Sequence, residues 1–256
     1  MNRSGRTGSA RALPVSRVTL GTMRLPGDDD TAAADLLAHA RDIGIRGFHC
    51  SAEYATFPLF AAAWARAGLA RADATLIAKV ASPHFGEDRF SATRFREKIE
   101  AYLQALDVER LDVVQWLLRH DLKAEEARLR ILREAEGEIA SVVDALRAEG
   151  KIGGFIGFPY TRPVADALVA ADWCDGVAVY LNPVERGMDA VVAACADRGK
   201  AVVAIRPFAA GRVFAETSLT ADDALRHVFD FPAVATAVVS ASSRAHLDVL
   251  RPWSAG

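Results

Sequence analysis

A histidine and a tyrosine stand at the end of a short strand-like segment near residue 50, and both side chains can exchange protons. Within residues 47–51, strand alternation places His49 on the face opposite Phe48 and Cys50. Tyr54 follows just past this segment. Because an imidazole and a phenol can each donate and accept a proton, the segment predicts a site for proton transfer. In a repeated strand and helix architecture, such strand ends gather at one rim, where active sites form.

The elements that must position these side chains are eight strand and helix pairs. The predicted strands are rich in Val, Ile and Ala, as expected for a parallel sheet that is covered on both faces. Gly137 marks a potential break in the longest predicted helix. Strands are predicted at 18–23, 47–51, 74–80, 111–119, 152–158, 175–182, 201–207 and 234–240, and helices at 31–44, 57–68, 91–107, 122–150, 161–172, 187–198, 220–229 and 243–251.

Eight such pairs in about 240 residues predict an α/β fold of the closed (β/α)8 TIM-barrel type. The main competitor is a doubly wound open sheet, which normally carries a glycine-rich phosphate loop after its first strand. Neither G-x-G-x-x-G nor G-x-x-x-x-G-K-[ST] occurs in the sequence. We therefore predict one barrel domain over residues 15–256, preceded by a flexible tail at 1–14. Arg3, Arg6 and Arg11 give this tail a weak similarity to an organelle transit peptide.

Composition excludes several classes of partner. The chain has 256 residues, 51% of them hydrophobic, and a formal net charge of −2. Its charges are of mixed sign along the helices, so no basic face for nucleic acid is predicted. No apolar run approaches the ~20 residues of a membrane span. Cys50, Cys174 and Cys195 are odd in number and far apart, which predicts buried thiols in a reducing cytoplasm and neither a disulfide frame nor a metal centre. The oligomeric state is not predicted.

A series of short segments resembles the aldo-keto reductases. In chain order the segments are Leu20-Gly21-Thr22-Met23, the helix and strand that lead to Tyr54, Ile77-Ala78-Lys79-Val80, Ala148-Glu149-Gly150-Lys151-Ile152, Tyr180-Leu181-Asn182-Pro183 and Ser242-Ser243-Arg244-Ala245-His246-Leu247. The resemblance implies a barrel enzyme that reduces small carbonyl compounds with NADP(H) through an Asp, Tyr, Lys and His tetrad. In that family the Tyr protonates the carbonyl oxygen, the Lys lowers the pKa of the Tyr, the Asp pairs with the Lys, and the His orients the substrate.

Only half of this tetrad is present. Tyr54 and Lys79 match the family pattern, whereas His49 stands at the Asp position and Leu117 at the His position. Since an imidazole cannot replace the negative charge, we expect either that His49 stays neutral or that Lys79 loses its proton more easily. Arg119, with His120 beside it, could polarise a carbonyl or hold a carboxylate. The alternative is that both merely begin a polar loop.

The cofactor positions also depart from the family pattern. Pro159 and Tyr160 replace a Ser-Asn pair, Ala178 replaces a Gln, Ile205 replaces a stacking aromatic residue, and Leu250 replaces an Asn that contacts adenine. Two places remain at which a phosphate group could bind: the start of the last helix and the segment after the seventh strand. Helix capping or a solvated charge would also explain the residues found there. The predicted cofactor-binding residues are Gly21, Thr22, Tyr160, Arg206, Gly211, Arg212, Ser242, Ser243 and Arg244.

Three functions follow as hypotheses. The first is NADP(H)-dependent reduction of a carbonyl compound with Tyr54 as general acid. The second is a cofactor-independent lyase, isomerase or cyclase that uses Tyr54, Lys79 and His49 for proton transfer. The third is a non-catalytic binding barrel. A zinc site built from His49, His84 and His120 is disfavoured, because ligand spacing is absent and Lys79 would oppose a cation. The long C-terminal loop of many family members is not expected, so the mouth should be more open or closed by a partner subunit.

Overall fold

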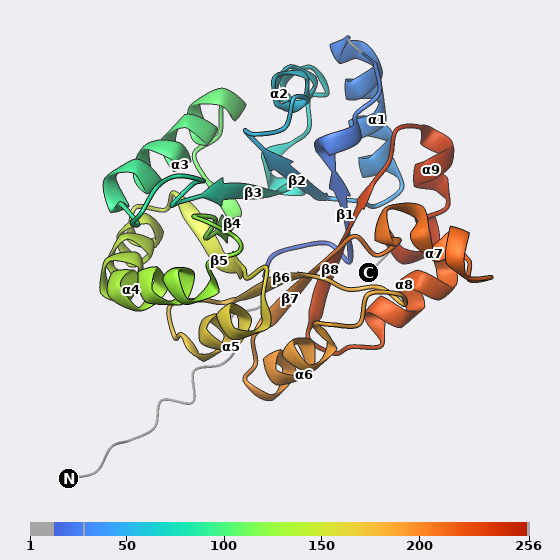
Figure 1. Cartoon of the computed structure of the whole chain (residues 1–256). Helices are drawn as coiled ribbons and strands as arrows, with labels where there is room; N and C mark the ends of the chain where they lie inside the picture. The colour runs from blue at the N-terminus through green and yellow to red at the C-terminus, as the bar shows by residue number, and fades with distance from the viewer. Residues whose placement is uncertain (1–12, 28, 255–256) are drawn as a thin grey trace, which may run out of the picture.

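The computed structural model describes residues 13–27 and 29–254, in which eight parallel strands close into a barrel ringed by helices (Figure 1). The strands follow one another in chain order, and β1 closes the ring by pairing with β8, where Leu20 lies opposite Val239. The predicted (β/α)8 barrel is confirmed, and the open doubly wound sheet is excluded. The strands are β1 (Val18–Gly21), β2 (Gly47–Ser51), β3 (Thr75–Ala81), β4 (Leu111–Leu117), β5 (Ile152–Phe158), β6 (Gly176–Tyr180), β7 (Ala201–Ile205) and β8 (Val234–Ser240).

Four of the α-helices in the described residues, α1, α3, α8 and α9, begin where a side chain accepts from free backbone N–H groups. Asp29 accepts from the N–H groups of Thr31 and Ala32 at the start of α1, and Thr220 forms a capping box with Asp223 at the start of α8. The helices are α1 (Asp30–Asp42), α2 (Phe57–Arg66), α3 (Ala92–Leu106), α4 (Glu125–Ala148), α5 (Arg162–Ala170), α6 (Asp189–Asp197), α7 (Arg212–Glu216), α8 (Ala221–Phe229), α9 (Arg244–Asp248) and α10 (Arg251–Ser254), with short 3-10 turns at η1 (Thr22–Arg24), η2 (Arg71–Asp73) and η3 (Ala209–Gly211).

Several element boundaries differ from the predicted ones. Helix α4 passes through Gly137 without a break. The helix predicted at 243–251 is two short helices, α9 and α10, and the strand predicted at 111–119 ends at Leu117. Helix α7 was not predicted. The first strand stops at Gly21, because the backbone turns there into η1 and carries Met23 and Arg24 over the barrel mouth.

The strands separate two apolar layers. The outer layer lies between the strands and the helices and includes Phe48, Trp116 and Phe155. The inner layer fills the barrel itself, with Ile77 and Val203 among its members. His49 therefore lies on the inner face while its neighbour Phe48 packs outward, as the strand alternation predicted.

Leu13 closes the lower end of the barrel. Its side chain belongs to the inner apolar layer and is 8% exposed. A β-carbon at Gly154 would lie 2.6 Å from Leu13 Cδ2, so glycine gives this side chain its space. The next residue, Pro14, accepts a hydrogen bond from Thr75. Residues 1–12 of the predicted tail lie outside the described residues, whereas Leu13 and Pro14 contact the barrel.

The C-terminal helix and the cysteines pack against the barrel. Trp253 stacks on Phe229 with ring centroids 5.4 Å apart, and its indole N–H donates to Asp222. The three cysteines are free and buried, and burial raises the pKa of Cys50 and Cys195 to about 12. They are therefore inert thiols.

Within the described part of the chain, no helix has both the length and the apolar character needed to cross a bilayer.

Candidate active site

A cavity of about 500 Å³ opens at the carboxyl ends of the strands, and every strand contributes at least one residue to its wall. Leu117, Phe158 and Val238 form an apolar part of this wall. Gly21 keeps the wall beside Val238 and Ser240 clear, because a β-carbon there would lie only 2.9 Å from Ser240 Oγ. The cavity thus occupies the rim at which barrel enzymes carry their active sites.

Tyr54 and Lys79 meet in this cavity. Ser51, the last residue of β2, is in register with Lys79 on β3, and the Tyr54 N–H donates to the Ser51 carbonyl in the turn that follows. Lys79 Nζ donates to Tyr54 Oη at 3.2 Å. Burial raises the pKa of Tyr54 above its usual value. Burial, aided by the charge of Arg119 and opposed by that of Glu53, lowers the pKa of Lys79 to about 8. A protonated phenol therefore lies beside an amine that exchanges its proton near neutral pH.

His49 pairs with a neutral partner. Its Nε2 donates to Gln115 Oε1 across the barrel interior at 2.9 Å, and both side chains are buried. Burial, followed by the charge of Lys79, lowers the pKa of His49 to about 4. The two outcomes expected from the sequence, a neutral His49 and a Lys79 that loses its proton more easily, thus occur together. The lowered pKa of Lys79 is caused by burial and by the charge of Arg119, and not by the imidazole. Gln115 Nε2 has no hydrogen-bond partner among the described residues.

The buried imidazole gives a measurable pH dependence. In the unfolded chain His49 binds a proton below its ordinary pKa of 6.5, whereas the folded protein resists protonation down to about 4. Stability is therefore unaffected by this group above pH 6.5 and is lost as pH falls below it. We expect the free energy of unfolding, measured with urea, to fall between pH 7 and pH 4.5 in both proteins. The fall should be about 2–3 kcal/mol smaller in His49→Asn than in the wild type. Equal losses in the two proteins would contradict the assignment.

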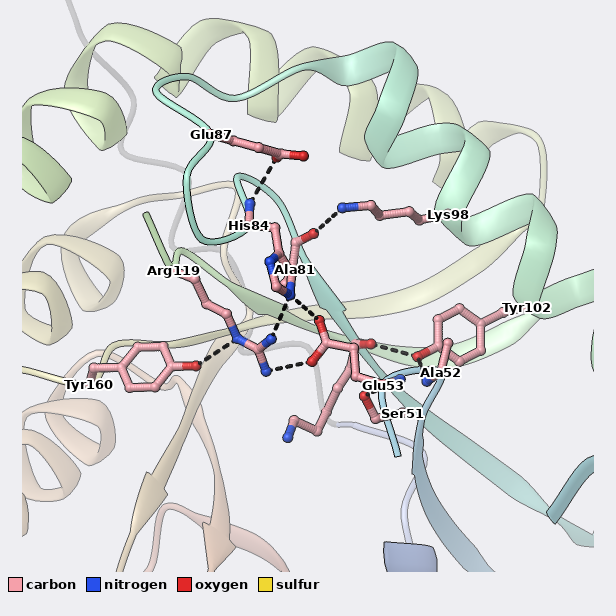
Figure 2. A network of polar contacts seen from close by, with 11 residues as sticks. Ser51, Ala52, Glu53, Ala81, His84, Glu87, Lys98, Tyr102, Arg119 and Tyr160 are labelled. Carbon is pink, nitrogen blue, oxygen red and sulfur yellow. Dashed lines mark hydrogen bonds and ion pairs between the residues drawn. The ribbon is translucent and has the colours of Figure 1, made fainter. Parts of the chain in front are cut away.

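Arg119, which lines the cavity together with Lys79, forms the centre of a polar network (Figure 2). Its guanidinium donates to Tyr160 Oη at 3.2 Å and lies 2.5 Å from a Glu53 oxygen. His84 Nε2 lies 2.9 Å from the guanidinium and 3.0 Å from the second Glu53 oxygen. One imidazole nitrogen cannot accept from Arg119 and donate to Glu53 at once, so the proton on His84 decides which contact is made. The network fixes Arg119 and Tyr160 as part of the cavity wall.

Two buried side chains hold this wall in place. The Tyr102 hydroxyl donates to the Lys79 carbonyl at 2.7 Å and accepts from the Ala52 N–H, so α3 joins β3 to the turn before Tyr54 (Figure 2). Arg128 on α4 is fully buried and donates to the carbonyls of Leu118 and Pro159. These two carbonyls directly precede Arg119 and Tyr160, so Arg128 ties together the loops that carry them.

The cavity wall is cationic. Arg24, Lys79, Arg119 and Arg206 line it, and no Asp or Glu does. Neither Arg24 nor Arg206 forms an ion pair within residues 13–27 and 29–254. The Arg206 guanidinium lies over the Tyr180 ring at 4.8 Å from the centroid. An anion would find unsatisfied positive charge here.

Backbone strain gathers at the same rim. Tyr160, Arg206 and Ala210 all line the cavity and have positive φ angles, at 59°, 57° and 57°. Each costs about 1 kcal/mol or more in a residue with a β-carbon, and such strain persists where the surroundings enforce it. Asn182 supplies part of that enforcement, because its side-chain amide donates to the Arg206 carbonyl at 3.1 Å.

Comparison with known proteins identifies the family of the chain. Residues 17–223 match the model of the aldo/keto reductase family. The chain belongs to the aldo/keto reductase family. The fold is similar to that of a protein from Pseudomonas aeruginosa that is assigned as an aldo-keto reductase, with 26% identity, a TM-score of 0.74 and coverage of 94% of this chain and 90% of that one. It is also similar to an aldo-keto reductase from Klebsiella pneumoniae in complex with NADPH, with 20% identity, a TM-score of 0.72 and coverage of 94% and 86%. No curated protein matches the chain closely enough to count as a relative.

The structure brings most of the predicted residues of this aldo/keto reductase to one place, though not all of them. Those that line the cavity are Gly21, His49, Tyr54, Lys79, Arg119, Tyr160, Arg206 and Gly211. Those that do not line it are Thr22, His120, Arg212, Ser242, Ser243 and Arg244. Thr22 is buried and donates to the His49 carbonyl, and His120 contacts the Glu87 carbonyl. Arg212 forms ion pairs with Glu185 and Glu216. The catalytic role predicted for His120 has no support from its position.

The residues predicted to bind phosphate at the start of the last helix lie outside the cavity wall. Ser243 caps α9, which has only five residues, and the Ser242 hydroxyl contacts His246. The histidines also have separate partners, so His49, His84 and His120 do not meet. Within the described residues no group of three or more His, Cys, Asp or Glu side chains is placed to hold a metal ion.

Sequence reasoning missed four residues of the site. Glu53 directly precedes Tyr54, and its position just past a strand end was the available signal. Gln115 could have been found from strand alternation, which puts it on the same face as Leu117. Arg24 sits one residue beyond the Leu20–Met23 motif. Asn182 lies in the Tyr180–Pro183 motif, but nothing in the sequence showed that it would hold the Arg206 carbonyl.

The residues present fit a nicotinamide dinucleotide in part. Arg24, Arg206, Ser240 and the backbone at Ala210 and Gly211 line the cavity and could hold phosphate or ribose oxygens. For the nicotinamide carboxamide, Pro159 offers no N–H, whereas the unpartnered Gln115 amide is free to donate. These donors could hold parts of the cofactor, through contacts that differ from those of the family pattern.

Proposed function

We propose that this aldo/keto reductase family member is an NADP(H)-dependent reductase of small aldehydes or ketones that carry a negative charge. The observation that carries the proposal is the Tyr54 phenol, which lies 3.2 Å from the Lys79 ammonium at the mouth of the barrel. Of the four positions of the family tetrad, these two are retained. The NADPH-bound Klebsiella pneumoniae structure supports the choice of cofactor.

When bound, NADPH would supply a hydride to the carbonyl carbon. The Tyr54 phenol would give its proton to the carbonyl oxygen as negative charge develops there. A positive charge on Lys79 stabilises the resulting phenolate, which is needed because burial disfavours the ionised phenol. His49 stays neutral and, with Gln115, would orient the carbonyl compound from the barrel floor. Arg119 would add positive charge at the wall and hold Tyr160 in position.

The charge of the wall supports an anionic substrate. Four cationic side chains and no carboxylate line the cavity. Arg206 and Arg24 have no ion-pair partner among the described residues, whereas Arg119 is engaged by Glu53, His84 and Tyr160. We therefore assign Arg206 and Arg24 to the anionic groups of substrate or cofactor. A charge-assisted hydrogen bond of this kind contributes about 1.5–3 kcal/mol.

A second candidate is cofactor-independent acid–base chemistry on a similar carbonyl compound. The observation that favours it is the pairing of a protonated phenol with an amine whose pKa is about 8. Such a pair can remove one proton and deliver another, as an isomerase or a lyase requires.

Binding and turnover of NADPH test the proposal. We expect quenching or enhancement of nicotinamide fluorescence on titration, and oxidation of NADPH when 4-oxobutanoate is added. Butanal is the matched neutral probe, and we expect its kcat/KM to be about 10–100-fold lower because it lacks the carboxylate. Absence of NADPH binding at millimolar concentration would overturn the reductase proposal. Equal kcat/KM for the two aldehydes would overturn the anionic substrate.

A further inference from the structure

Lys79 differs from every other lysine of the chain in its surroundings. It is the one lysine that lines the cavity, and its Nζ contacts a phenol and no carboxylate within 4 Å among the described residues. The other four are occupied or exposed: Lys151 pairs with Glu100 and Glu149, Lys98 and Lys200 donate to backbone carbonyls, and Lys123 lies on the surface.

Burial and the charge of Arg119 favour a neutral amine at Lys79, whereas the charge of Glu53 opposes it. On β2 the facing side chain is His49, which is neutral, and beyond β2 lie Tyr54 and the carboxylate of Glu53, which is paired with Arg119. Beyond β4, the Arg119 guanidinium adds a like charge. Tyr102 on α3 contributes a hydroxyl that donates to the Lys79 carbonyl. Burial and Arg119 lower the pKa of Lys79 from 10.5 to about 8. About one-tenth of the amine is then neutral at pH 7, compared with less than one part in a thousand for an ordinary lysine.

We propose that Lys79 forms an imine with small aldehydes or ketones that enter the cavity, which is an activity beyond hydride transfer from NADPH. Three features support it: a lysine amine without a carboxylate partner, an adjacent phenol that can supply a proton, and a cavity that admits a carbonyl compound to both. Covalent catalysis by lysine requires this combination of a desolvated amine and a nearby acid.

The proposed steps balance without any co-reactant. The lone pair of the neutral Nζ forms a bond to the carbonyl carbon, the C=O π bond breaks, and a proton passes from nitrogen to oxygen to give a carbinolamine. The Tyr54 phenol then protonates the hydroxyl, the C–O bond breaks, and water leaves. The nitrogen lone pair forms the C=N bond, and the phenolate takes back a proton from the iminium. No group is oxidised or reduced.

The cationic wall defines the class of carbonyl compound. An anionic group on the ligand would be attracted to Arg206 or Arg24, which line the same cavity as Lys79. We therefore expect 4-oxobutanoate to be captured better than butanal.

Reductive trapping tests the proposal without any nucleotide. The whole protein is incubated at pH 7 with 4-oxobutanoate and sodium cyanoborohydride, which reduces an imine to a stable secondary amine. Peptide mapping by mass spectrometry then locates the added mass, which equals the probe less one oxygen atom. We expect Lys79 to be labelled at least tenfold faster than Lys123. Peptide mapping distinguishes label on these two lysines from label on the amino terminus. Labelling of Lys79 at or below the rate of Lys123 would overturn the proposal.

Two variants and a pH series sharpen the result. Lys79→Arg keeps the positive charge and should lose the label at this position only. Tyr54→Phe should keep the amine but slow trapping severalfold, because loss of water lacks its acid. The trapping rate in the wild type should rise with pH and level off above about pH 8. A Lys79 rate that keeps rising in parallel with Lys123 above pH 9 would contradict the proposal, and because NADPH is absent, failure of the reductase proposal would leave this test unaffected.

Discussion

Tyr54→Phe is expected to lower kcat for NADPH-dependent reduction of 4-oxobutanoate by about 10²–10⁴-fold, the range typical of a lost general acid. Among the described residues, the Tyr54 phenol is the one acidic hydroxyl that is hydrogen-bonded to Lys79 Nζ. Its raised pKa keeps it protonated across the neutral range, so its removal takes away the proton donor and not a structural charge. Steady-state kinetics and a nicotinamide fluorescence titration measure the effect, and cofactor binding should change by only a few-fold.

Tyr160→Phe is the matched control for this prediction. Its hydroxyl accepts from Arg119 and stands on the same cavity wall, so its loss removes one hydrogen bond and no proton donor to the carbonyl. We expect a loss of about tenfold or less in kcat/KM. If Tyr54→Phe and Tyr160→Phe had the same effect, Tyr54 would be a wall residue and not the acid. Retention of full kcat in Tyr54→Phe would remove the basis of both enzymatic proposals.

The fold could be predicted from the sequence because each unit is a local pattern. A Val- and Ile-rich run followed by an amphipathic segment recurs eight times, and closure follows from that number. Element ends were less predictable. Glycine at position 137 destabilises α4 by about 1 kcal/mol. The burial of Ala135 and Ile139, on either side of it, stabilises the helix by more than this, so the helix continues. Helix α7 has five residues, too few to show a period.

Residues of the site could be predicted only where a reactive side chain stands at the end of a strand. Tyr54 and Lys79 are found by that rule and by the family motifs. Partners that are distant in sequence were not predictable, because strand register decides them: His49 meets Gln115 across 66 positions, and Arg119 meets Glu53 across β2, β3 and β4. The same limit explains His120. It directly follows Arg119, but its positive φ of 39° turns the chain there, and its imidazole contacts the Glu87 carbonyl outside the cavity.

Trp116→Ala is expected to lower the free energy of unfolding by about 3–5 kcal/mol. Trp116 is 1% exposed and belongs to the outer apolar layer. Its ring packs against Phe155 at 6.1 Å between centroids and against Trp173 at 6.1 Å, so truncation leaves a large gap between β4, β5 and the segment before β6. Urea unfolding followed by circular dichroism measures the loss. A change below about 1 kcal/mol would mean that the neighbouring rings close the gap.

Trp116→Phe separates packing from hydrogen bonding at the same position. The indole N–H donates to the Ser82 carbonyl, in the loop that leads to His84. Phenylalanine retains most of the ring contact and loses this bond, so we expect a loss of about 1 kcal/mol in stability. Because the bond anchors the loop that carries His84, the ion pairs of Glu53 should also loosen, and Lys79 would then lose part of its shielding from solvent. The pH at which Lys79 trapping levels off should therefore rise in Trp116→Phe, whereas an unchanged value would show that the outer layer and the active site are not coupled through this loop.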